Sequence, residues 1–170
     1  MKDTGVIRKI DELGRIVIPK EIRRSLGIRD GENLEIFVNN NGITLQKHSR
    51  LINYQELANQ LANLAYEMMD YKILIFDRDE VMAAFKNEYK HILINQKLQK
   101  LLENRENYES LNKEIILDEI EACYYLILPI IISTDVVGLI VMINDKLFVN
   151  EQRKFLKFLN KLLVNKIDIL

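Results

Sequence analysis

The hydrophobic residues in the last two thirds of the chain follow the patterns of buried strands and amphipathic helices. Two apolar runs, residues 124–132 and 136–143, are rich in Ile and Val, and the polar triplet 133–135 separates them. Because β-branched residues favour strands and the triplet favours a turn, the pattern predicts a buried β-hairpin. Gly138, inside the second run, indicates a point where another group approaches the strand closely.

This apolar stretch, residues 124–143, is nearly long enough for a membrane-spanning helix, which needs about 20 apolar residues. However, Asp135 lies inside the stretch, where a carboxylate costs about 3 kcal/mol. The N-terminus has neither the apolar segment nor the small-residue cleavage site of a signal peptide. We therefore expect a cytoplasmic protein with no membrane segment.

The surrounding pattern predicts the rest of an α+β domain. Apolar residues spaced 3, 4, 3 and 4 apart indicate a helix that either forms a coiled coil or packs on its own domain: Tyr54, Leu57, Leu61, Leu64 and Met68. Further strands are predicted at residues 72–76, 81–85 and 115–117, and further helices at 92–104 and 149–167. This order of elements is typical of an antiparallel sheet with helices packed against it.

The first fifty residues have a different pattern of short strands, glycines and one helix. The helix is predicted over residues 20–26, with Pro19 in its first turn and Gly27 as its left-handed cap. Strands are predicted at residues 5–10, 15–18, 34–38 and 43–47. A domain this small, with so few large apolar side chains, buries little surface alone. We therefore expect an intertwined dimer in which two copies complete one sheet.

The composition becomes informative only when the chain is divided. The 170 residues are 48% hydrophobic and 29% charged with a net charge of −1, which excludes a disordered chain and argues against nucleic-acid binding. Residues 1–50, however, carry ten basic and seven acidic side chains, whereas residues 51–170 carry 14 and 18. We therefore predict two domains, 1–50 and 51–170, with a boundary near residues 49–53, of which the first is basic.

The stretch GVIRKIDELGRIVIPKEIRRSLGIRDGENLEIFV resembles the DNA-binding domain of the AbrB family of bacterial transition-state regulators, and within that family the SpoVT group. The resemblance implies a swapped-hairpin, β-barrel-like dimer, mainly β with one short helix, that presents arginines to double-stranded DNA. Matching positions assign DNA contact to Arg8, Arg15, Arg23 and Arg24, with Lys9 and Lys20 at the edge.

Arginine suits this role because its planar charged fork matches phosphate oxygens and the edge of guanine. A dimer doubles the four arginines to eight. The alternative is that they are solvated charges on a small sheet, with Glu21 and Arg24 paired for little energy. Asp11 and Glu12 either shape the loop that carries Arg15 or only add solubility, and the sequence leaves this open.

Residues 51–170 resemble a GAF-like domain in their order of elements. The resemblance implies a regulatory domain that oligomerises, giving a tetramer, and that either senses an unknown small-molecule effector or only packs against its copy. It assigns no binding residues.

Together these features and the resemblance predict a sequence-specific DNA-binding transcription regulator, and the resemblance implies that it acts on sporulation or transition-state genes. We expect no cofactor and no metal. One alternative is a metabolite-sensing or oligomerising module with only incidental DNA contact. Another is an antitoxin-type autoregulator, which would need a short disordered tail in place of the long second domain.

Side chains suited to catalysis are few. Cys123 is flanked by apolar residues without a nearby histidine, which is typical of an inert core cysteine. His48 and His91 lack metal-ligand spacing. Asp77 and Asp79 could hold a cation, but an exposed turn explains them more simply. We expect no enzyme activity.

Overall fold

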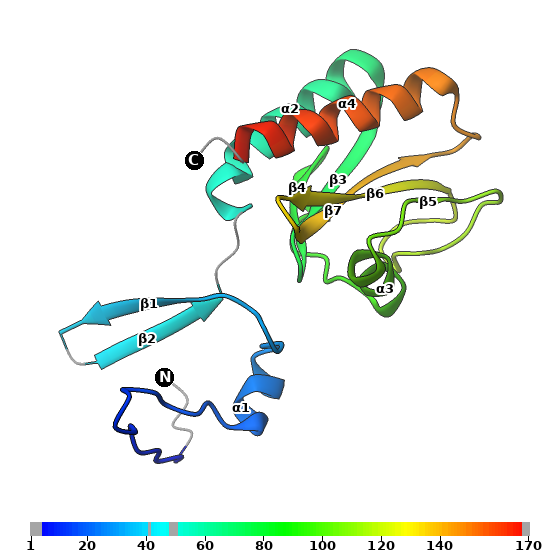
Figure 1. Ribbon diagram of the computed structural model, residues 1–170. Coiled ribbons are helices and arrows are strands. Elements are labelled where there is room, and N and C mark those ends of the chain that lie inside the picture. Colours follow the sequence, from blue (N-terminus) through cyan, green and yellow to red (C-terminus); the bar gives the residue numbers. More distant parts are fainter. Residues whose placement is uncertain (1–4, 41, 48–50, 168–170) are drawn as a thin grey trace. The chain divides into compact units, whose positions relative to one another are not determined.

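The structure is a computed structural model that describes residues 5–40, 42–47 and 51–167. The chain divides into two units, residues 1–48 and 49–170. Figure 1 shows both units, coloured along the sequence.

The N-terminal unit contains one short helix and one β-hairpin. Helix α1 covers Lys20–Ser25, and strands β1 (Leu34–Asn39) and β2 (Gly42–Lys47) pair antiparallel. Pro19 lies directly before the helix rather than in its first turn, and the positive φ of Gly27, 62°, lies just beyond its end. The predicted helix, its glycine cap and the predicted hairpin are therefore confirmed.

The predicted strands at residues 5–10 and 15–18 are not formed within the single chain, because neither segment pairs with a neighbour among the residues that the structure describes. Strands need a ladder of backbone hydrogen bonds. The backbone bonds found here are local: the N–H of Asp11 donates to the carbonyl of Arg15 at 3.0 Å, and the N–H of Gly14 donates to that of Asp11 at 2.9 Å. The apolar side chains of this segment consequently stay exposed, Ile7 by 89% and Val17 by 74%.

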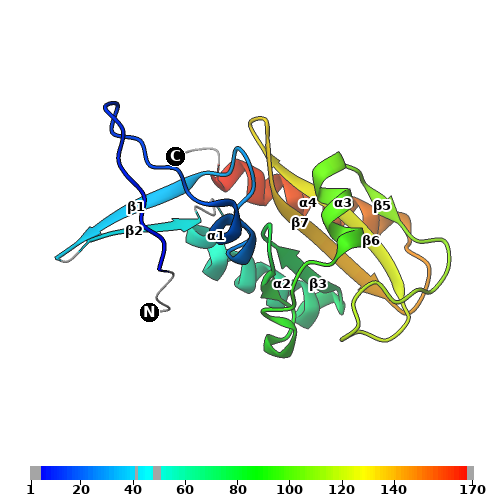
Figure 2. The ribbon, with the colours of Figure 1, turned by 90° about the horizontal axis from the view of Figure 1, so that it is seen from below.

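The C-terminal unit is a five-stranded antiparallel sheet with helices on both faces. Its strands are β3 (Lys72–Phe76), β4 (Val81–Ala84), β5 (Tyr108–Glu109), β6 (Tyr124–Ile132) and β7 (Asp135–Asn144), in the order β4-β3-β7-β6-β5. Its helices are α2 (Gln55–Met69), α3 (Gln96–Asn104) and α4 (Asn150–Ile167), with short 3-10 helices at Ile52–Tyr54 and Asn87–Tyr89. Figures 1 and 2 show α2 and α4 side by side on one face and α3 on the other.

Burial on both faces of the sheet explains the long apolar run in the sequence. In β3, Ile73 and Ile75 pack under α2 and α4, whereas Leu74 and Phe76 pack under α3. Such two-sided strands need apolar residues at every position. The run forms the predicted hairpin of β6 and β7, and no helix in the described part of the chain is long and apolar enough to cross a membrane.

Gly138 lies where β7 passes the end of β3. A Cβ added at this position would be 2.0 Å from the backbone oxygen of Phe76 and 2.7 Å from Cδ1 of Leu51. The close approach expected at Gly138 is thus confirmed, and it lets Leu51, only 1% exposed, fill the core beneath α2.

Three sequence predictions for the C-terminal unit need correction. Helix α3 begins only after Asn95, because the backbone of residues 91–94 forms hydrogen bonds with residues in and just before β4. The side chain of Asn95 caps the helix by accepting a hydrogen bond from the N–H of Leu98 at 3.0 Å. Residues 115–117 form no strand: Ile116 and Leu117 are buried in the core, Ile115 is 64% exposed, and the pairing beside them is a single bridge between Glu114 and Cys123. A strand at β5 was not predicted.

Helix α2 packs on its own domain mainly through alanines and only in part through the predicted stripe, of which Tyr54 and Leu61 contact the core. Ala58, Ala62 and Ala65 are buried against the sheet. Leu64 and Met68 remain 50% and 76% exposed. Small residues let the helix lie close to the sheet, and part of the stripe is left at the surface.

Candidate nucleic-acid interface

A loop at residues 11–15 carries the first of the predicted DNA-contacting arginines. Oδ1 of Asp11 accepts hydrogen bonds from the N–H of Leu13 at 3.0 Å and of Arg15 at 2.8 Å. Its other oxygen accepts from Nε of Arg15 at 2.8 Å. Asp11 therefore shapes the loop and orients Arg15, whose side chain is 71% exposed. The structure thus decides the question that the sequence left open for Asp11.

The hydrogen bonds from Arg15 hold the pKa of the Asp11 carboxyl below its usual value of 3.8. A carboxyl whose pKa is lowered in the folded state stabilises that state above its unfolded pKa, and this effect disappears as the pH falls through the lowered value. The loop is therefore fully held at neutral pH.

Replacing Asp11 with alanine should loosen the loop without unfolding the chain. The backbone N–H groups of Leu13 and Arg15 lose their acceptor, so we expect their amide protons to exchange faster at pH 7 by about tenfold or more. Hydrogen exchange measured by NMR checks this, with Glu12→Ala as the control in the same loop. Unchanged exchange at both amides would show that Asp11 does not hold the loop.

Helix α1 carries Lys20, Arg23 and Arg24. Two of them, Lys20 and Arg24, are exposed. Arg23 instead forms an ion pair with Asp30, which ties the helix to the turn before β1, and 36% of its side chain is exposed. Arg23 thus has a structural partner that the sequence analysis missed, since a separation of seven residues across a turn is not a helical spacing.

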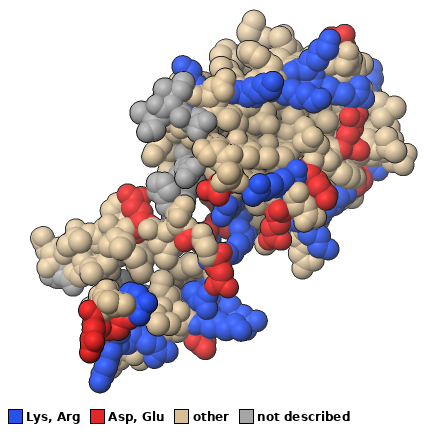
Figure 3. All heavy atoms as spheres, in the orientation of Figure 1, with Lys and Arg blue, Asp and Glu red and all other residues tan. Residues whose placement is uncertain are grey.

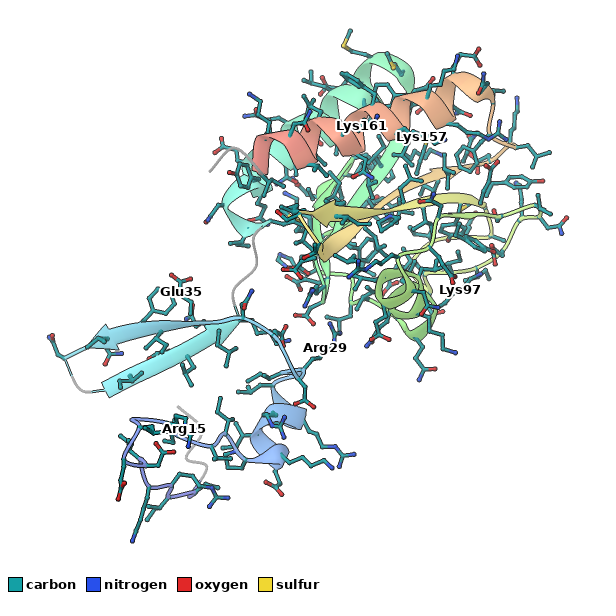
Figure 4. The ribbon with its side chains drawn as sticks, viewed as in Figure 1. Arg15, Arg29, Glu35, Lys97, Lys157 and Lys161 are labelled. Atoms are coloured by element: carbon teal, nitrogen blue, oxygen red, sulfur yellow. The ribbon has the colours of Figure 1, made fainter. Side chains whose placement is uncertain are left out.

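The predicted contact residues belong to the same unit but come from two segments. Arg8, Lys9 and Arg15 lie on the segment before α1, and all three are exposed. Figure 3 shows Lys and Arg side chains at the lower end of the N-terminal unit, interspersed with acidic ones. Figure 4 shows Arg15 on its loop and Arg29, which is not among the predicted residues, at the other side of the unit.

An apolar hollow of about 290 Å³ lies beside these basic residues. Its lining comes from the segment before α1, from α1 and the residues after it, and from β2: Val6, Arg8, Ile16, Val17, Ile18, Pro19, Ile22, Leu26, Ile28, Ile43 and Leu45. Val38 of β1 pairs with Ile43 and is 82% exposed. One face of the hairpin is therefore apolar and open to solvent.

The C-terminal unit shows no grouping of catalytic side chains in the residues described. Cys123 is buried, and burial raises the pKa of its thiol. Asp77 accepts hydrogen bonds from the N–H groups of Asp79 and Glu80 and so closes a turn. No three His, Cys, Asp or Glu residues in the described ranges are placed to hold a metal ion. His48 lies outside these ranges.

Comparison with protein families divides the chain in the same way. The model described as antidote-toxin recognition MazE, bacterial antitoxin, matches residues 7–53. The model described as stage V sporulation protein T C-terminal, transcription factor, matches residues 53–164.

Two curated relatives from Bacillus subtilis (strain 168) are similar to the chain. Stage V sporulation protein T is 37% identical over 153 residues, which cover 85% of each chain. Transition state regulatory protein AbrB is 56% identical over 48 residues, which cover 28% of this chain and 50% of that protein.

A solved structure supports the fold of the C-terminal unit. The GAF domain from Acinetobacter phosphoenolpyruvate-protein phosphotransferase matches with a TM-score of 0.52 at 17% identity, covering 69% of this chain and 86% of that one. The C-terminal unit therefore has a GAF-like fold, as its order of elements predicted.

Proposed function

Since the chain belongs to the stage V sporulation protein T family of transcription factors, we propose that it is a sequence-specific DNA-binding regulator of sporulation or transition-state genes. It would act in the cytoplasm, where bacterial DNA is found. The observation that supports this proposal most directly comes from the N-terminal unit. There, the loop shaped by Asp11 presents Arg15, and helix α1 presents exposed Lys20 and Arg24.

These side chains suit both parts of DNA recognition. Exposed lysines and arginines neutralise phosphates, which supplies sequence-independent affinity. The arginine fork also matches the N7 and O6 edge of guanine, which supplies specificity. We assign Arg8, Arg15 and Arg24 to direct contact, with Lys9 and Lys20 at the edge. Arg23 is assigned to contact through the exposed part of its side chain while it holds the turn at Asp30.

Self-association of the N-terminal unit is the second part of the proposal. The segment before α1 lacks a strand partner, and the apolar hollow beside it is lined by Val17, Ile43 and Leu45. A second copy supplies both the missing partner and the apolar side chains, so two chains form one intertwined DNA-binding head. The dimer places two copies of each arginine on the DNA.

The exposed part of the leucine stripe supports association of the C-terminal units as well. Besides Leu64 and Met68 of α2, Phe158 of the neighbouring helix α4 is also exposed, by 61%. Pairing of heads and pairing of these helices together give a tetramer. Light scattering on the full-length protein should then report four times the chain mass of 20.0 kDa, and a mass of one chain would contradict the proposal.

Replacing Arg24 with alanine tests the DNA interface. Each arginine that binds DNA is worth about 1–3 kcal/mol, and the dimer loses two, so we expect at least about a thirtyfold loss of affinity. The measurement is fluorescence anisotropy with a DNA duplex that the full-length protein selects from a random pool. The slope of log affinity against log salt should also become shallower by about 0.9 for each phosphate that the variant no longer neutralises.

Arg29→Ala is the control within the same unit, since it removes the same charge at an arginine that is not among the assigned contacts. If Arg24→Ala and Arg29→Ala weaken binding equally, the assigned interface is wrong. If the wild-type protein binds selected and random duplexes equally, DNA contact is incidental and the regulator proposal fails.

The antitoxin alternative receives no support from the second unit. The antitoxin model matches only the first part of the chain. The residues after it form a sheet covered on both faces, whereas an antitoxin of this kind needs a disordered tail.

A further inference from the structure

A hollow of about 450 Å³ lies at one end of the C-terminal sheet. It is formed where β3 begins and β7 ends, together with the residues that follow β4, the loop that precedes β6 and Tyr66 of α2. The volume lies in the range of small-molecule sites. By contrast, buried side chains that include Leu74, Phe76, Leu98 and Leu102 pack in the space between the sheet and α3.

The lining of this hollow includes a cluster of three aromatic rings. The ring centroids of Tyr66 and Phe85 are 5.1 Å apart at an interplanar angle of 53°, and those of Phe85 and Tyr89 are 4.9 Å apart and stacked at 25°. Phe85 is buried in the middle, and the two tyrosines are half-buried at its sides. The cluster fixes the tyrosine rings, which offer a flat apolar surface to a ligand at little cost in side-chain entropy.

The charged groups of the hollow fall into two classes. Nζ of Lys72 donates to Asp145 at 3.1 Å, and this hydrogen bond raises the pKa of Lys72, so these two charges neutralise each other. Lys86 is exposed, and its ammonium lies 5.9 Å from the centroid of the Tyr66 ring. Glu119 and Glu121 are exposed, and they form no ion pair with any residue that the structure describes.

Besides the Lys72–Asp145 pair, the hollow therefore offers one cation and two carboxylates in a mainly polar lining that also contains aromatic and apolar side chains. A ligand with only a negative charge would be repelled by the two carboxylates, and a ligand with only a positive charge would leave the ammonium of Lys86 without an opposite charge. A zwitterion satisfies both signs, and a flat side chain suits the tyrosine rings and the apolar side chains of Ile120 and Ile143.

We infer that this hollow binds a free aromatic amino acid. Its ammonium group lies against Glu119 and Glu121, its carboxylate against Lys86, and its ring against the tyrosines. Charge-assisted hydrogen bonds to the ammonium and to the carboxylate of the ligand, both attached to its Cα, then fix its orientation.

Thermal unfolding of the full-length protein with defined probes tests the ligand class. L-Phenylalanine at ten times its dissociation constant should raise the Tm of the C-terminal unit by about 3 to 6 °C. Phenethylamine lacks the carboxylate and 3-phenylpropionate lacks the ammonium, so each should bind at least about tenfold more weakly. No shift with L-phenylalanine at about 20 mM would overturn the inference, as would equal shifts with either analogue.

Charge-removing variants test the place of binding. Lys86→Gln, and separately the pair Glu119→Gln and Glu121→Gln, should each abolish the shift while leaving the Tm without ligand unchanged, because all three positions are exposed. Lys100→Gln, an exposed lysine of α3 outside the hollow, should retain the full shift. Retention of the shift in both hollow variants would overturn the site. DNA affinity of the same variants without ligand should be unchanged, so failure here is distinct from failure of the regulator proposal.

Discussion

Replacement of Gly138 with alanine is expected to lower the free energy of unfolding of the C-terminal unit by about 3 kcal/mol or more. The added Cβ would lie 2.0 Å from the backbone oxygen of Phe76, which belongs to the neighbouring strand and cannot rotate away. To make room, β3 and β7 would have to separate in the middle of the sheet. Chemical denaturation followed by circular dichroism measures the loss.

Gly42→Ala is the control for this substitution. No atom lies within 4 Å of a Cβ added at Gly42 other than its own chain neighbours, so its effect should stay within about 0.5 kcal/mol. A Gly138→Ala protein as stable as wild type would mean that the two strands are not packed as closely as the structure shows.

Introduction of a glutamate at Ile43 is expected to abolish both self-association of the N-terminal unit and DNA binding. Ile43 is 70% exposed in a single chain, so the substitution would be nearly neutral if the unit worked as a monomer. In an intertwined dimer the same side chain is buried, and an unpaired buried carboxylate costs several kcal/mol. We expect the mass measured by light scattering to fall and the affinity for DNA to drop more than about a hundredfold.

Thr44→Glu provides the matched control on the same strand. Successive side chains of a strand point to opposite faces, so Thr44 lies on the face opposite Ile43 and outside the apolar hollow. This variant should keep the wild-type mass. Loss of association in both variants would indicate general damage to the hairpin, and loss in neither would contradict the proposed dimer surface.

The parts of the fold that the sequence predicted well are those whose own residue types determine the local structure. The hairpin of β6 and β7 is apolar at almost every position between its ends because both of its faces are buried, and Gly138 is the one glycine within it. Gly27 adopts the positive φ expected of a helix cap. These signals are local, so one sequence is enough to detect them.

The errors arose where the structure depends on distant partners. Residues 5–10 and 15–18 have the composition of strands, but a single chain provides no strand beside them. In α2 the large leucines suggested the core face, whereas the small alanines allow the closer approach to the sheet. Within the candidate DNA site, the six basic residues came from a resemblance, while the roles of Asp11 and Asp30 required the loop geometry.

The unpaired segment before α1 also bears on how the protein responds to its own amount in the cell. If the head completes its sheet only when two chains meet, folding of the head and assembly are one step, and its stability depends on concentration. At low levels the amount of active head then rises with the square of the chain concentration. A modest increase in synthesis thus produces a disproportionate increase in bound DNA, and dilution by growth reverses it as steeply.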